Sequence, residues 1–279
     1  MTEKFDRVYR LEIGEPGKIG KRFSQLQMSF TVEKSTAKNG NKATVSILNP
    51  NPETKGVVTA ARDLRVRLYA GYRGRDGRGT PQLIYEGKVG KRGALIERVP
   101  PDTTITLECV DKIPPGALSA RSSFNWNFEA GTTNRQVLDQ IIKEAGLGVG
   151  FLSTIPLQTY KSGVVFLGSV EEALDKIVDP AGLEWSLQDW RLQILERGSV
   201  TTVTAPVISA RTGMINAPTR TDKGINVKMF LEPSLAPGMP VKVIADAVDG
   251  FFRCRNVTHS GNLREGEWMT EIEAEEIET

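Results

Sequence analysis

The chain has 279 residues, of which 39% are hydrophobic and 25% charged, and its formal net charge is +2. This balance is typical of a globular protein and excludes a disordered or fibrous chain. No apolar run approaches the ~20 residues that a membrane-spanning helix needs, and the start MTEKFDRVYR lacks the apolar stretch of a secretory signal. We therefore expect no membrane insertion, and a chain that stays in the cytoplasm or leaves it without a signal.

The first part of the chain, residues 1–115, is expected to form a small antiparallel β-barrel with one helix. In LQMSFTVE, apolar and polar residues alternate from Leu26 to Glu33, as in a strand with one buried face. Asn39-Gly40 is a hairpin turn signal. In NPETKGVVTAARD, Asn51 is suited to cap a short helix and Pro52 to occupy its first turn.

The middle part, residues 116–200, follows the break Pro114-Pro115-Gly116 and contains an internal repeat. TNRQVLDQIIKEAGL (133–147) and SVEEALDKIVDPAGL (169–183) align without gaps. Each begins with a capping Thr or Ser, continues as an amphipathic helix and ends at Gly. A helical solenoid needs at least three copies. The two copies therefore predict an α/β insert built from two helix–strand units.

The last part, residues 201–279, returns to the period of β-strands. INVKMFL alternates from Ile225 to Leu231, and EWMTEIEAE places Trp268, Ile272 and Ala274 on one face. This predicts a second antiparallel barrel. The fold class is therefore mainly β (α+β), with an α/β insert between two small β-barrel domains.

His259 is the only histidine and the first candidate for catalysis. Its neighbour Ser260 points to the opposite face of a strand, and no nucleophile elbow or metal-ligand spacing is present. We therefore expect His259 to hold a turn or an edge, in a protein with no catalytic residue, metal or cofactor. The glutamates between Glu265 and Glu278 lie on a solvated or partner-facing strand surface.

The segment GYRGRDGRGTP carries Arg73, Arg75 and Arg78. It lacks the Gly-Lys-Ser/Thr of a phosphate-binding loop. It is either a flexible hairpin tip or a contact with an acidic neighbour or a phosphate backbone.

Net charge is unevenly spread along the chain. Residues 1–112 hold 21 Lys or Arg against 13 Asp or Glu, whereas residues 260–279 hold one Arg against seven Glu. This asymmetry suggests head-to-tail assembly or contact with an anion, and a solvated surface explains it equally well.

The C-terminal stretch holds several short segments in a fixed order: Thr212-Gly213, Pro218-Thr219, Leu231 to Gly238, Gly250 to Arg253, His259 to Asn262 and Trp268 to Thr270. In this order they resemble the terminal domain of baseplate hub proteins from contractile-tailed phages. That family is related to the amino-terminal half of VgrG-type spike proteins and to phage late-control protein D. Asn262 stands where the family usually has Asp.

The resemblance implies a homotrimeric structural hub with two tube-like domains per subunit. Such a hub joins the hexameric tail tube to the trimeric central spike and contacts wedge or tape-measure proteins. It surrounds a channel through which DNA passes without specific binding. It is part of the virion and is assembled in the host cytoplasm. His259 and Trp268 then occupy structural hairpin positions. The alternatives are a tail-associated cell-wall hydrolase and a nucleic-acid-binding barrel protein.

Overall fold

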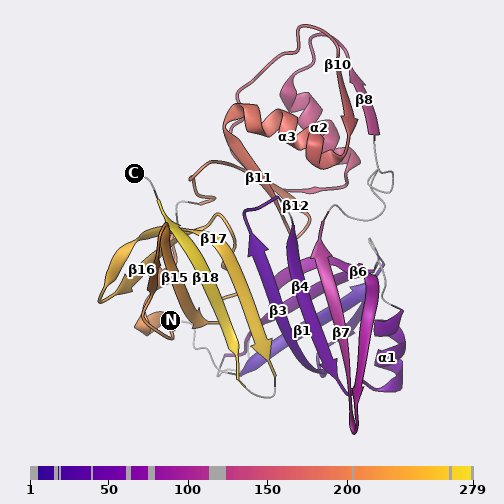
Figure 1. Ribbon diagram of the computed structural model, residues 1–279, viewed down its shortest axis with the longest axis vertical. Helices are drawn as coiled ribbons and strands as arrows, with labels where there is room; N and C mark the ends of the chain where they lie inside the picture. The colour runs from indigo at the N-terminus through magenta and orange to yellow at the C-terminus, as the bar shows by residue number, and fades with distance from the viewer. Residues whose placement is uncertain are drawn as a thin grey trace.

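The computed structural model in Figure 1 describes residues 6–15, 18, 20–38, 40–60, 64–74, 79–112, 124–202, 204–263 and 266–277. Two antiparallel β units lie side by side, and an α/β insert lies at one end of them. The predicted fold class, mainly β with an α/β insert between the two β units in sequence, is confirmed. None of the helices in these residues has the length and apolar character needed to cross a bilayer.

The first β unit is built from strands that alternate buried and exposed residues, as predicted. In β3, Met28, Phe30 and Val32 are buried and contribute to its core. Helix α1 begins at Pro52, and the Asn51 side chain accepts a hydrogen bond from the Thr54 N–H at 2.7 Å. The elements are β1 Arg7–Gly14, β2 Lys21–Phe23, β3 Gln27–Ser35, β4 Asn41–Leu48, α1 Pro52–Thr59, β5 Arg65–Tyr72, β6 Gln82–Val99 and β7 Asp102–Asp111.

The insert contains both predicted helices, each with a capping box at its start. Thr133 and Gln136 cap α2, and Ser169 and Glu172 cap α3. Each helix leads into a strand, and both of these strands belong to one sheet in the order β11-β12-β9. The elements are β8 Phe124–Phe128, α2 Asn134–Glu144, β9 Gly148–Leu152, β10 Val164–Gly168, α3 Val170–Val178, β11 Leu183–Gln188 and β12 Arg191–Glu196.

The second β unit has its own apolar core, which includes Val227, Val257 and Ile272. Its elements are β13 Val207–Ile208, β14 Thr219–Thr221, β15 Gly224–Phe230, β16 Pro240–Ala245, β17 Val248–Asn262 and β18 Trp268–Glu276. The boundary expected at residue 115 lies outside the described residues. We keep the division at residues 115 and 200 as a proposal.

The two β units share one continuous sheet, which the sequence did not predict. Strand β17 pairs antiparallel with β18 on one side and with β3 on the other. The strand order is therefore β14-β15-β18-β17-β3-β4-β7-β6-β5-β1-β2. Hydrogen bonds across the β17–β3 pair fix the second β unit rigidly to the first.

Candidate assembly surfaces

His259 lies in the interior of β17, where it pairs with Val32 of β3 and Thr270 of β18. The expected place at a turn or an edge is therefore wrong, because the sequence gives no sign of the β3 neighbour. The side chain is 1% exposed, and its Nδ1 lies 2.9 Å from Thr270 Oγ1. Burial and the nearby Lys34 ammonium lower the pKa of His259 to about 3, against a backbone hydrogen bond at Leu235.

The contacts of His259 and Thr270 are those of side chains that stabilise the fold. Thr270 Oγ1 also accepts the Glu232 N–H at 2.9 Å, so it ties β18 to the segment before β16. Ser260, the next residue in sequence, lines a pocket on the opposite face of the sheet. No group of three His, Cys, Asp or Glu side chains in the described ranges is placed to hold a metal ion.

Trp268 is buried, as its alternation in the last strand indicated, but it packs into the core of the first β unit. Its ring meets Phe30 edge to face, with centroids 5.4 Å apart. The Arg7 guanidinium lies 5.7 Å from the ring centroid and donates to the Asn262 and Gly266 carbonyls. Trp268 therefore joins the last strand to the beginning of the chain.

Of the three arginines in the arginine-rich segment, only Arg73 lies within the described residues. Arg73 is half exposed, and its backbone N–H donates to the Asp6 carbonyl at 2.8 Å. Arg75 and Arg78 lie outside the described residues. A contact role for this segment therefore stays a prediction.

The acidic last strand is largely neutralised by neighbouring strands of the same chain. Glu271 lies 3.2 Å from Lys228, and Glu275 lies 2.7 Å from the buried Arg253. In the first β unit, Glu12 forms ion pairs with several arginines. The glutamates of the last strand are thus largely compensated within the chain, whereas the 21 Lys or Arg of residues 1–112 still outnumber their 13 Asp or Glu. Head-to-tail attraction stays a prediction.

One face of the continuous sheet carries short hydroxyl side chains across both β units. Ser260 pairs with Thr31, and Thr31 pairs with Thr44. In the adjacent row, Ser46 Oγ and Thr106 Oγ1 are 3.0 Å apart. An open pocket of about 300 Å³ lies over this face. The hydroxyl face consists of Ser29, Thr31, Thr44, Ser46, Thr106 and Ser260.

Two places along this sheet expose apolar side chains. After a register shift between Val89 and Ala94, β6 continues to Val99 with β7 on one side only, and no other described strand pairs with that part. Leu95, Ile96 and Val99 there are 42%, 45% and 63% exposed. Near the β14 end of the strand order, beside β15, Ile215 and Phe230 are 40% and 50% exposed.

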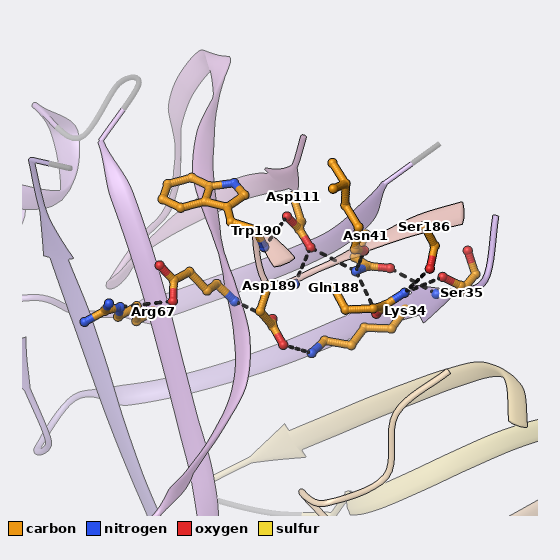
Figure 2. A network of polar contacts seen from close by, with 11 residues as sticks. Lys34, Ser35, Asn41, Arg67, Asp111, Ser186, Gln188, Asp189 and Trp190 are labelled. Atoms are coloured by element: carbon orange, nitrogen blue, oxygen red, sulfur yellow. Dashed lines mark hydrogen bonds and ion pairs between the residues drawn. The ribbon is translucent and has the colours of Figure 1, made fainter. Parts of the chain in front are cut away.

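The insert is attached to the first β unit through the turn between β11 and β12, shown in Figure 2. Asp189 and Trp190 form this turn, with φ angles of 54° and 61°. Left-handed backbone costs a non-glycine residue ~1–2 kcal/mol, so the surroundings must hold the turn. Asp111 does so, because its carboxylate accepts the Asp189 N–H at 2.7 Å and the Trp190 N–H at 3.1 Å.

The groups around Asp111 complete a buried polar network. Asn41 Nδ2 donates to Asp111 at 3.0 Å and to the Leu187 carbonyl at 2.8 Å. The Asp189 carboxylate lies 2.6 Å from Lys34 Nζ and accepts the Glu86 N–H at 2.8 Å. Burial and the Asp189 charge raise the pKa of Asp111 to about 7, although the N–H donors from Asn41, Asp189 and Trp190 oppose this.

A second set of contacts attaches the insert to the second β unit. Arg253, which is 2% exposed, pairs with Glu184 of β11 and with Glu275 of β18. Gln193 of β12 donates to the Pro237 carbonyl at 3.1 Å. The β11–β12 hairpin is therefore fixed to both β units. No sequence signal marked Asp111.

Comparisons with known proteins agree with this architecture. The family model described as "Baseplate hub gp41" matches residues 17–252. None of the curated proteins matches the chain. Among solved structures, the 43 kDa tail protein of prophage MuSo2 from Shewanella oneidensis is similar, with a TM-score of 0.66 at 10% identity, covering 97% of this chain and 98% of that one.

Two further structures share the fold. An E. coli component of the type VI secretion system, described as similar to the bacteriophage T4 tail proteins gp27 and gp5, gives a TM-score of 0.57 at 13% identity, covering 95% of this chain and 76% of that one. A chain of the Francisella PdpA–VgrG complex gives 0.58 at 7% identity, covering 98% of this chain and 58% of that one. At these identities the likeness concerns the fold alone.

Proposed function

The chain belongs to the baseplate hub gp41 family, and on this premise we propose that it is the homotrimeric hub of a contractile phage tail. The hub joins the hexameric tail tube to the trimeric central spike and contacts wedge or tape-measure proteins. It is a structural part of the virion, assembled in the host cytoplasm, and it has no enzymatic activity.

The pairing of β17 with β3 is the observation that supports this role most directly. It makes two β units of one subunit into neighbours in a single sheet. Three subunits then supply six β units in a ring, which matches a threefold spike to a sixfold tube. A rigid pairing is needed, because a flexible link between the units would not keep the six places equivalent.

The two apolar places on the sheet support closure of such a ring. We place the free side of residues 94–99 in β6 against the β14–β15 end of the next subunit. Unpaired strand edges readily accept a strand from another chain, and Leu95, Ile96 and Phe230 would be covered there. A permanent interface buries on the order of 2,000 Å² or more.

The hydroxyl face is our candidate for the channel wall. Short hydroxyl side chains such as Thr31, Thr44 and Ser260 present no cations to DNA phosphates, and the one lysine beside them on β4, Lys42, pairs in register with Glu33. Protein cations supply most of the sequence-independent affinity for DNA. A wall of this kind suits DNA that passes without specific binding.

Stoichiometry and one pair of variants test the proposal. Cryo-electron microscopy of intact tails should show three copies of the chain at the junction of tube and spike. Leu95→Glu places a charge in the proposed contact and should prevent the ring, whereas Leu157→Glu, at an insert position that is 74% exposed, should not. Six or twelve copies per tail, or normal rings with Leu95→Glu, would contradict the proposal.

A further inference from the structure

The turn at Asp189 and Trp190 is unusual for a two-residue hairpin. Such turns need positive φ at both positions, which favours Asn-Gly or Asp-Gly. Here the second position is a tryptophan with φ of 61°. Its ring is 8% exposed and lies 5.5 Å from the Arg65 guanidinium of β5. A glycine at the second position would make the turn easy to form. The chain has Trp190 there instead, and its side chain fills the contact with the first β unit.

The backbone of this turn is held from outside the insert. Both of its N–H groups donate to the two carboxylate oxygens of Asp111, the last residue of β7. Asp111 is 0% exposed and has a further donor in Asn41 of β4. Figure 2 shows Asp111, Asn41 and Lys34 gathered around the turn. The conformation of the turn and the position of the insert thus depend on the same carboxylate.

We propose that Asp111 is the positioning residue that seats the insert on the first β unit, by holding the Asp189–Trp190 turn in its left-handed conformation. Without that carboxylate the turn relaxes toward ordinary backbone angles. Trp190 then leaves its place beside Arg65, and Asp189 leaves Lys34 and the Glu86 N–H. The insert stays attached to the second β unit through Arg253 and Gln193, and to Lys38 of the first β unit through Asp175 and Asp179. Its loss of position is therefore a rotation limited by those contacts.

Two spin labels can measure the position of the insert in the full chain at a pH well above 7, where Asp111 is ionised. Introduced cysteines at Glu53 in α1 and Arg135 in α2 are exposed. The native Cys109 and Cys254 are 2% and 0% exposed, and burial raises the pKa of each thiol to about 12, so neither competes for the label. Distances between the two labels report where the insert lies relative to the first β unit.

Asp111→Asn is the first variant, because an amide cannot accept both turn N–H groups. We expect its distance distribution to broaden and gain a second component. The matched control is Asp249→Asn, which removes a carboxylate that is exposed and paired with Lys242 in the second β unit. It should keep the single distribution of the parent. A folded Asp111→Asn protein with the parental distribution would overturn the proposal.

A double-mutant cycle with Trp190→Gly tests whether Asp111 acts through the turn or stabilises the fold independently of it. Glycine adopts left-handed backbone without penalty, so one of the two left-handed positions no longer needs support and the turn depends less on Asp111. We expect Asp111→Asn to disturb the distances, or the folding, less in the Trp190→Gly background than in the parent. Equal effects in both backgrounds, including failure to fold in both, would show that Asp111 does not act through the turn.

Discussion

Two buried groups in this protein should respond to pH in opposite directions. His259 has its pKa lowered to about 3 from an ordinary 6.5, so between these values the unfolded chain binds the proton and the folded chain does not. Its contribution to stability is present above pH 6.5 and is lost as the pH falls. Asp111 has its pKa raised to about 7 from 3.8, so the folded chain binds that proton more tightly. Its contribution is present below pH 3.8 and is lost as the pH rises toward 7.

The two effects cancel over a defined interval. Between about pH 4.5 and 6 the unfolded chain carries the proton on His259 and the folded chain carries one on Asp111. One proton of difference corresponds to ~1.4 kcal/mol of unfolding free energy per pH unit. The parent protein should therefore show little net slope from these groups. Because His259 is the only histidine in the chain, no other imidazole contributes.

The variant His259→Gln separates the two contributions. Glutamine does not titrate and can still hydrogen bond to Thr270. Its free energy of unfolding should fall by up to about 1.4 kcal/mol per unit as the pH rises through this interval. Asp111→Asn, wherever it folds, should show the opposite slope. Urea denaturation at several pH values, followed by circular dichroism, measures both. A pH profile for His259→Gln that runs parallel to that of the parent would refute the assignment of opposed buried groups.

Three further outcomes are expected. Trp268→Ala should lower the free energy of unfolding by ~3–5 kcal/mol. Trp268→Phe should lower it less, because its ring still meets Phe30. Chemical denaturation compares the two variants, and equal losses of unfolding free energy would speak against that packing. Replacing Arg73, Arg75 and Arg78 together with alanine should impair tail assembly at physiological salt, and normal tails in negative-stain images would rule out a contact role. Purified protein should release nothing from peptidoglycan in a zymogram and should show no specific DNA band shift; clearing of peptidoglycan would revive the hydrolase alternative.

Local features of the fold were predictable because they depend on neighbours in sequence. Asn51, Thr133 and Ser169 each accept a hydrogen bond from a backbone N–H three residues later, so their helix starts could be assigned from residue type alone. Alternation in strands follows from the period of two in side-chain direction. These signals placed both helices of the insert and most strands of the β units.

Contacts between distant segments were not predictable from one sequence. The β17–β3 pair joins residues such as His259 and Val32, and no local pattern specifies which edge an amphipathic strand will meet. The same limit explains why Trp268 was placed on the correct face of its strand but not in the core of the first β unit. Asp111 gave no signal, because a single aspartate at the end of a strand usually lies in solvent.

Strand β17 connects these observations physically. Its 15 residues pair with β16, β18 and β3, so the two β units cannot separate without breaking a continuous hydrogen-bonded ladder. Arg253 on the same strand holds Glu184 of the insert. In the proposed role, load passes between a tail tube and a spike, so the parts of the hub need to move together. Buried pairing through one shared strand provides that rigidity, since each part is stabilised by contacts that also fix the position of the next.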